Sequence, residues 1–169
     1  MRRVAILVLA LLSLVSCTIP VLRSDLLDQG IRDVSMTQLA GSPQLYKGKL
    51  FILGGRIVSI SLTETGSVIE AVHIPADSAG YLKETQTTTG RYLALYPREL
   101  GVLDSMLYNA GRLITLAGEF TQLRPGRIGE KEYAFPCFVV RQIYLWPEGQ
   151  TTRGFPSAFF STGFGVGRW

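Results

Sequence analysis

The 169-residue sequence predicts a mainly β domain, namely a small five-stranded barrel with one short helix between its third and fourth strands. Three observations predict this fold class. Short apolar segments alternate with turn residues from residue 45 onward, and helical periodicity never lasts for more than two turns. The first apolar segment is long and interrupted by Gly54 and Gly55. One helical pattern falls in a single gap between strands.

Each predicted strand is rich in apolar residues and stops at a turn residue or a proline. The expected strands cover residues 50–62, 67–74, 91–96, 112–123 and 133–146, with a loop at 124–129. In the first strand, the glycine pair suits either a bulge or the sharp coiling of a strand that serves both sides of a barrel. Pro75, Pro97 and Pro147 end three of the strands, because proline lacks the amide hydrogen that continues a ladder.

Residues 99–109 carry the helical pattern. Leu100, Leu103, Met106 and Leu107 lie at offsets of three and four from one another, as on one face of a helix. The resulting order β-β-β-α-β-β matches the OB-fold, a partly open Greek-key barrel. An open meander or a small sandwich is the alternative architecture.

The predicted fold and the composition of the two ends divide the sequence into four segments. They are a signal peptide at residues 1–16, a lipidated N-terminus and tether at 17–44, the OB-like barrel domain at 45–147, and an aromatic, Gly-rich tail at 148–169. A short helix capped by Ser35 is expected within the tether. The tail lacks a helical stripe, so it is either disordered or an adhesive segment for membrane interfaces and partner pockets. Its aromatic residues are Phe155, Phe159, Phe160, Phe164 and Trp169.

The first 17 residues have the order of an export signal. Arg2 and Arg3 give a positive start, residues 4–15 are apolar, and small residues precede Cys17. This apolar run is too short to cross a bilayer, which takes about 20 residues in a helix. The sequence Leu14-Val15-Ser16-Cys17 resembles a bacterial lipobox, in which the cysteine is acylated and the chain is cut before it. An ordinary secretory signal with a cysteine nearby is the alternative.

The lipid predicted on Cys17 is a diacylglycerol with an additional N-linked acyl chain such as palmitate, and no other cofactor is expected. Several acyl chains give stable attachment, because each buried methylene contributes about 0.8 kcal/mol. Thr18 follows the cysteine, whereas an aspartate at this position tends to retain bacterial lipoproteins in the inner membrane. By that resemblance we expect attachment through lipid to the outer membrane, on its periplasmic face.

The composition is that of a globular domain with little net charge. The formal charge of +4 includes Arg2 and Arg3, so their removal with the signal lowers it by two. This charge is too small to indicate nucleic acid as a partner. Once Cys17 carries lipid, Cys137 is the one remaining cysteine, which excludes a disulfide framework. Its apolar neighbours predict a buried, unreactive thiol rather than a reactive one.

Several short pieces of the sequence, taken together, resemble a known family. They are the lipobox, Pro43-Gln44-Leu45-Tyr46-Lys47-Gly48-Lys49, Gly54-Gly55-Arg56-Ile57, Glu70, Pro75, Gly90-Arg91-Tyr92-Leu93-Ala94, Asp104, Tyr108, Gly111-Arg112 and Gly118. In this order and spacing they resemble the Slp family of Gram-negative outer-membrane lipoproteins, sometimes described as starvation-inducible. The resemblance implies an outer-membrane lipoprotein without an assigned enzymatic activity. It covers about residues 43–146, and the extension from 147 to 169 departs from it.

No motif for catalysis stands out. A nucleophile elbow, a phosphate-binding glycine loop and a metal-binding cysteine pair are absent from the sequence. His73, the only histidine, lies inside a predicted strand, where a hydrogen-bonded structural imidazole is the usual role. Glu130 and Glu132 flank Lys131 in a charged turn. We therefore expect neither an enzyme nor a metal site; a hydrolase using His73 or a thiol enzyme using Cys137 is a remote third function.

Two charges lie within apolar strands. Glu70 and Arg91 fall on the adjacent second and third strands, so we expect a structural ion pair between them. The same region carries the candidate ligand face, because OB-folds bind oligosaccharides and oligonucleotides across strands 2 and 3 and the adjoining loops. The expected residues of this face are Arg91, Tyr92, Tyr96, Arg124, Arg127 and Lys131.

The sequence leaves two functions open. One is a structural lipoprotein, related to envelope stress or starvation, whose barrel is not catalytic and whose partner is an envelope protein. The other is an OB-type binding module for an anionic envelope glycan. Aromatic rings of the face would stack on sugars, and guanidinium groups would fork onto phosphate or carboxylate.

Overall fold

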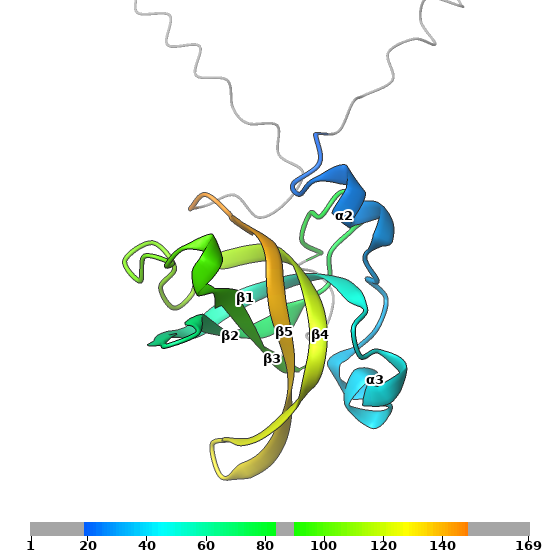
Figure 1. Cartoon of the computed structure of the whole chain (residues 1–169), viewed down its shortest axis with the longest axis vertical. Coiled ribbons are helices and arrows are strands. Elements are labelled where there is room, and N and C mark those ends of the chain that lie inside the picture. Colours follow the sequence, from blue (N-terminus) through cyan, green and yellow to red (C-terminus); the bar gives the residue numbers. More distant parts are fainter. Residues whose placement is uncertain (1–18, 84–89, 149–169) are drawn as a thin grey trace, which may run out of the picture.

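The computed structural model describes residues 19–83 and 90–148, so the predicted signal peptide, Cys17 and nearly all of the aromatic tail lie outside the described residues. Five strands form the barrel. They are β1 (Leu50–Thr63), β2 (Gly66–Ile74), β3 (Arg91–Pro97), β4 (Leu113–Ile128) and β5 (Lys131–Leu145). The barrel is closed in the order β1-β2-β3-β5-β4, and β1 pairs with β4 (Figure 1). β3 and β5 run parallel. The predicted five-stranded, OB-like barrel is confirmed.

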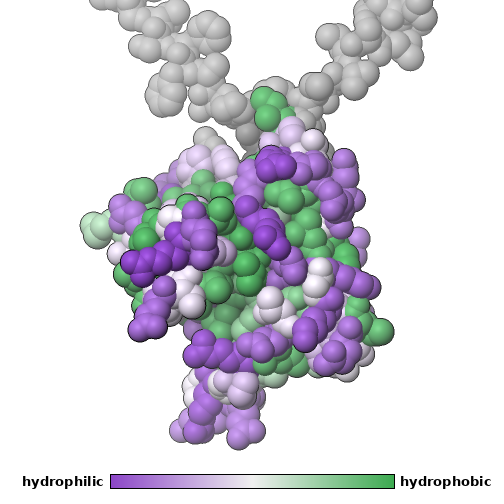
Figure 2. Space-filling model, viewed as in Figure 1, coloured by the Kyte–Doolittle hydropathy of each residue, from purple (hydrophilic) through white to green (hydrophobic). Residues whose placement is uncertain are grey.

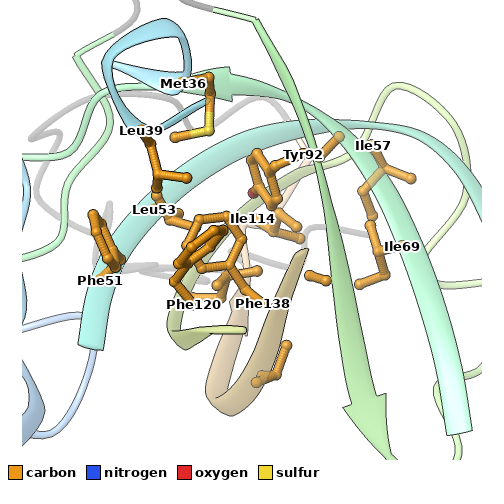
Figure 3. Packing of buried hydrophobic residues seen from close by; sticks show 14 of the residues in the cluster. Met36, Leu39, Phe51, Leu53, Ile57, Ile69, Tyr92, Ile114, Phe120 and Phe138 are labelled. Atoms are coloured by element: carbon orange, nitrogen blue, oxygen red, sulfur yellow. The ribbon is translucent and has the colours of Figure 1, made fainter. Parts of the chain in front are cut away.

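Aromatic rings from four strands meet in the core of the barrel (Figure 3). The Phe138 ring lies 5.5 Å from that of Phe51, 5.8 Å from that of Tyr92 and 5.6 Å from that of Phe120. The contacts with Phe51 and Tyr92 are edge-on, an arrangement that aromatic pairs favour, and the contact with Phe120 is tilted. Apolar residues at alternate positions of the strands provide them, because successive side chains of a strand point to opposite faces.

The glycine pair of β1 makes room for two neighbours, because a Cβ atom at Gly54 would meet Leu82 and one at Gly55 would meet Tyr92. A Cβ atom at Gly55 would lie 2.4 Å from the Tyr92 hydroxyl, and that hydroxyl donates a hydrogen bond of 3.4 Å to the Gly54 carbonyl. The register shift of β1 lies further along, between Ile57 and Ser59. Close approach of a neighbouring side chain therefore explains the two glycines better than a bulge does.

The segment before the barrel folds onto it, so the prediction that residues 17–44 form a tether is wrong for the described residues. It contains α2 (Ser24–Gln29), α3 (Met36–Gly41) and the 3-10 helix η1 (Pro43–Leu45). Ile31 bridges to Phe51 of β1 in a parallel direction. The apolar residues that cover the barrel are Leu22, Leu27, Met36 and Leu39, all of which are buried. Their burial is the physical reason that the segment is ordered.

The helix predicted after Ser35 is present as α3. The Ser35 hydroxyl accepts a hydrogen bond from the Gln38 amide, and the Gln38 side chain accepts one from the Ser35 amide. This reciprocal pair is a capping box, which satisfies amide groups at the start of the helix. Met36 and Leu39 then point into the barrel core (Figure 3). No described helix is long and apolar enough to cross a membrane.

β4 and β5 continue past the barrel as a two-stranded arm at the end of the molecule opposite α2 (Figure 1). Their pairing runs in register from Arg124 and Phe135 to Ile128 and Lys131. The loop predicted at residues 124–129 is therefore wrong, apart from the turn at Gly129. Pro125 is tolerated because each strand of an isolated pair has a free edge, where the missing amide breaks no ladder.

The helix predicted at residues 99–109, between β3 and β4, is much shorter in the structure. The connection holds a 3-10 helix, η2 (Arg98–Leu100), and then continues through turns. Gly101 ends η2 with a φ of 116°. Of the apolar residues at helical spacing, Leu103 is buried, but the exposed ones are Leu100, Met106 and Leu107. A short helix without a surface to cover is marginal in water, so the spacing alone does not produce one.

Candidate functional site

A cleft of about 250 Å³ lies between the base of the arm and the outer face of the barrel. Residues of β1, β2 and β3 line one side, and the first residues of the arm line the other. The lining includes Ser59, Ser61, Glu70, Arg124, Arg127 and Phe135. This is the surface of strands 2 and 3 at which OB-folds bind extended ligands.

Arg124 and Arg127 are the two cations of the predicted face that line the cleft. The Arg127 guanidinium donates a hydrogen bond of 2.9 Å to the Glu130 carbonyl, which directs it along the arm. Among the described residues, none forms a hydrogen bond or an ion pair with the Arg124 guanidinium, so its five N–H donors are available to a ligand. Lys131 lies further out, at the exposed start of β5.

Arg91 is paired with Glu70 at the edge of the cleft. Its Nη1 atom lies 2.7 Å from Glu70 Oε1, and the two side chains are 32% and 23% exposed. Glu70 lies opposite Leu93 and Arg91 lies opposite Val72, so the ion pair is a diagonal one between β2 and β3. The carboxylate therefore offsets the charge of Arg91, and this cation contributes little net charge to the cleft.

Tyr133 attaches the base of the arm to the start of β3. Its hydroxyl accepts a hydrogen bond of 2.9 Å from the Arg91 amide and donates one of 3.0 Å to the Arg91 carbonyl. A Cβ atom at Gly90 would lie 2.5 Å from this hydroxyl, and Gly90 has a φ of 131°. Glycine is thus required on both steric and backbone grounds. The contact holds the two walls of the cleft in one arrangement.

The structure removes both tyrosines from the predicted ligand face. Tyr92 is fully buried in the core, where burial raises the pKa of its hydroxyl. Tyr96 packs against the same core, and its hydroxyl donates to the Leu100 carbonyl at 3.0 Å. The assignment of Tyr92 to the face is wrong because Arg91 and Tyr92 are neighbours in one strand and point to opposite sides.

Four residues that line the cleft were not part of the predicted ligand face. Ser59 and Ser61 come from β1, Phe135 comes from β5, and Glu70 was assigned to the ion pair alone. The alternation of Ser59 and Ser61 with apolar residues is a signal for an outward polar face. No sequence signal identifies Phe135, because its place depends on the pairing of β4 with β5.

A larger open hollow of about 880 Å³ lies between α2 and the barrel, in contact with η2. Its five charged residues nearly balance, with the cations Arg23, Lys49 and Arg141 against the anions Glu99 and Glu119. Arg141 lies 2.6 Å from Glu119, and Arg23, at its edge, lies 2.6 Å from Asp25. Exposed pairs of this kind contribute little and leave little net charge for a ligand. The cleft under the arm is the better candidate.

The two residues considered for catalysis do not line the cleft. His73 is buried beside Tyr92, with ring centroids 6.3 Å apart, and burial lowers its pKa to about 4. The imidazole is therefore neutral near pH 7. Burial also raises the pKa of the half-buried Cys137 thiol, which disfavours the reactive thiolate.

Glu130 and Glu132 lie at the tip of the arm. The described residues contain no group of acidic, cysteine and histidine side chains that could hold a metal ion.

Two relatives from Escherichia coli K12 align with about two thirds of the chain. The uncharacterized lipoprotein YeaY is 27% identical over 111 residues, which make up 66% of this chain and 55% of YeaY. The outer membrane protein Slp is 27% identical over 112 residues, which make up 66% of this chain and 57% of Slp. The chain thus spans about half the length of the curated relatives it matches.

Two solved structures have a similar arrangement over part of the barrel. The mitochondrial single-stranded DNA binding protein Rim1 of S. cerevisiae is 10% identical with a TM-score of 0.34, and the match covers 59% of this chain and 95% of Rim1. The Plasmodium falciparum SSB, in complex with ssDNA, is 12% identical with a TM-score of 0.34, and the match covers 58% of this chain and 94% of SSB.

A family of sequences matches nearly the whole chain. The family described as the outer membrane lipoprotein Slp family matches residues 14–167. The match begins at Leu14, includes Cys17 and runs through most of the aromatic tail. The expectation that residues 147–169 depart from the family is therefore wrong. Because the match covers far more than half of its length, the chain belongs to the Slp family of outer membrane lipoproteins.

Proposed function

We propose that this protein is a non-catalytic binding domain, anchored by lipid on Cys17 to the periplasmic face of the outer membrane, whose cleft binds an anionic envelope glycan. The observation that carries the binding role is the position of Arg124 and Arg127 in one cleft with Ser59 and Ser61. Guanidinium groups bind phosphate and carboxylate through paired hydrogen bonds, and hydroxyl groups suit sugars.

The shape of the surface favours an extended ligand. The cleft is smaller than most small-molecule pockets, which measure about 300–1,000 Å³. It shares Pro125, Gly126 and Arg127 with a second depression of about 570 Å³ along the arm, to which Tyr133 contributes. One charged group of the glycan and the sugar ring that carries it therefore occupy the cleft. The next sugar of the glycan lies along the arm, beyond Tyr133.

The surroundings of His73, Cys137 and Glu70 support the proposal that the domain is not catalytic. His73 is neutral and buried in the barrel, and Cys137 has a raised pKa. In the cleft, Glu70 pairs with Arg91, and no other described residue that lines the cleft carries a carboxylate with which Glu70 would share acid and base roles. These arrangements favour binding over hydrolysis.

The lipid anchor is supported by the start of the family match at Leu14, within the lipobox-like sequence that ends at Cys17. Mass spectrometry of protein extracted from membranes tests it directly. We expect an N-terminal peptide that begins at an acylated Cys17. A peptide that retains Met1, or an unmodified Cys17 in mature protein, would contradict the anchor.

A structural envelope lipoprotein, connected with stress or starvation, is the second candidate function. The observation that favours it is the Glu70–Arg91 ion pair, which offsets one of the three arginines around the cleft. In that case the cleft contacts an envelope protein or holds the arm in place, and no glycan binds with specificity.

An NMR titration separates the two candidates. The ¹⁵N-labelled mature chain with Cys17→Ser is titrated with phosphorylated core oligosaccharides of lipopolysaccharide and with peptidoglycan fragments. We expect shifts at residues 59–61, 124–127 and 133 that persist at physiological salt, and their loss in Arg124→Gln. Arg141→Gln is the matched control, because Arg141 lies elsewhere on β5 and pairs with Glu119. Shifts that vanish with modest salt, or that are equal in both variants, would contradict glycan binding.

A further inference from the structure

The fold brings the predicted lipid site close to the barrel. Cys17 precedes Ile19 by two residues, which span at most about 7 Å. The Ile19 carbonyl accepts a hydrogen bond of 3.0 Å from the Tyr81 hydroxyl, and the Val21 amide donates one of 2.9 Å to the Ala79 carbonyl. Because the chain is attached to the barrel from residue 19 onward, a lipid on Cys17 places this side of the barrel at the bilayer surface.

A row of direct contacts leads from this attachment point to the connection between β3 and β4. The Tyr81 ring lies 5.5 Å from the Trp146 ring. The Arg112 guanidinium donates hydrogen bonds of 3.0 Å to the Trp146 carbonyl and to the Leu107 carbonyl. Leu107 is thus linked through Arg112, Trp146 and Tyr81 to the segment that begins at Ile19.

This connection carries exposed apolar side chains. We name them the loop patch, which consists of Leu100, Val102, Met106 and Leu107, and Met106 is 79% exposed. The loop lies at the left-hand side of the barrel in Figure 1, where hydrophobic residues reach the surface in Figure 2. Ile19 is also exposed, and Tyr144, which stacks edge-on with Trp146, is partly so. Apolar groups gathered on one side of a soluble domain mark a contact with a partner or a membrane.

We propose that this side is a membrane-contact face, in which Met106 and Leu107 enter the phospholipid leaflet that holds the Cys17 lipid. The proposal rests on the acylation of Cys17 given above. Tyr81 and Tyr144 lie at the level of the headgroups, where amphipathic rings are favoured. A phospholipid surface is the occupant because the short link to Cys17 keeps it within reach, and burial of the apolar side chains adds to the attachment.

The attachment of the chain start to the lipid also orients the cleft. The arm lies at the end of the molecule opposite α2 and the start of the described chain (Figure 1). With Ile19 held next to the lipid on Cys17, the arm lies far from the attachment point. The cleft at the base of the arm is then held away from the attachment point, where glycans of the periplasm are accessible.

The methionines allow a test with an internal control. Besides Met1, which leaves with the signal, the chain contains Met36, which is buried at the start of α3, and Met106. The lipidated protein, labelled with [¹³C-methyl]methionine, is reconstituted in nanodiscs of phosphatidylethanolamine and phosphatidylglycerol that contain a headgroup nitroxide lipid. We expect the Met106 methyl signal to lose several-fold more intensity than that of Met36. Equal loss, or no loss at either methyl, would overturn the face.

A pair of variants tests whether the apolar contact causes this effect. Leu107→Gln should reduce the broadening of Met106 several-fold, whereas Leu45→Gln, at another exposed leucine that lies in η1, should leave it unchanged. The same effect of both variants would overturn the role of the loop patch. A chain whose Cys17 is coupled chemically to a maleimide lipid gives the same measurement without native acylation. The face and the lipid anchor can thus fail separately, since mass spectrometry tests the anchor alone.

Discussion

The segment before the barrel and the connection between β3 and β4 have similar apolar patterns but opposite outcomes. In the first, Leu27 and Leu39 are buried against the barrel and the chain forms α2 and α3. In the second, Met106 and Leu107 follow Leu103 at helical spacings of three and four, but both are exposed and the described residues of the connection form no α-helix. Helical spacing is therefore not sufficient: the apolar face must also find a surface to cover.

The difference also separates two uses of apolar residues. The N-terminal residues contribute to stability because folding removes them from water. Those of the loop patch remain in water when the domain is alone, so they are available for a second surface. The following predictions test this contrast, from the largest expected effect to the smallest.

Leu39→Ala should destabilise the domain by about 2–5 kcal/mol, because it leaves a cavity between α3 and the core. Leu39 is 0% exposed, whereas Leu45, which follows α3, is 65% exposed. Leu45→Ala should change the stability by less than about 0.5 kcal/mol. Urea unfolding of both variants measures the difference. Equal effects would show that the segment is not part of the folded unit.

The pH dependence of unfolding tests whether His73 is buried and neutral in the barrel, which lies between the two regions. The pKa of His73 is lowered by burial from 6.5 to about 4, so between these values the unfolded chain binds a proton that the native one does not. Stability is complete above pH 6.5 and falls toward pH 4, by up to about 3 kcal/mol at roughly 1.4 kcal/mol for each pKa unit. Urea unfolding between pH 7 and pH 4.5 measures this loss, which His73→Gln should reduce. An equal loss in that variant would assign it to other groups.

Ser35→Ala removes the cap of α3 and should cost about 1 kcal/mol. Ser24→Ala is the matched control, because Ser24 begins α2, which has no side-chain cap hydrogen bond. Thermal unfolding of the two variants compares the ends of the two helices. If Ser35→Ala were neutral, the tertiary contacts of Met36 and Leu39 alone would hold α3 in place.

Met106→Gln should have the smallest effect, with the free energy of unfolding unchanged within about 0.5 kcal/mol, because the side chain is exposed in the native domain. Urea unfolding of the lipid-free chain measures this. A loss above about 1 kcal/mol would show that Met106 is packed in solution. The contrast between the two regions would then disappear.

Much of the barrel could be predicted because the local signals agree with the tertiary structure. The alternation of apolar residues and the prolines at strand ends place β1, β2 and β3 within one residue of their observed bounds. The arm was missed because Arg124, Pro125 and Gly126 have loop composition, and only the pairing with β5 makes them a strand. The cleft was predicted in part, since two of its arginines were identified but its serines and Phe135 were not.

The sequence alone determined the family, the five strands, their order along the chain, the capped helix after Ser35 and the expectation of a cross-strand pair between Glu70 and Arg91. These features depend on residue types at short spacing, so they are encoded locally. The tertiary structure alone decided that residues 19–44 cover the barrel, that Tyr92 enters the core beside Gly55, and that the loop patch remains exposed. Each of these depends on which distant surface a side chain meets, and burial against that surface provides most of the free energy.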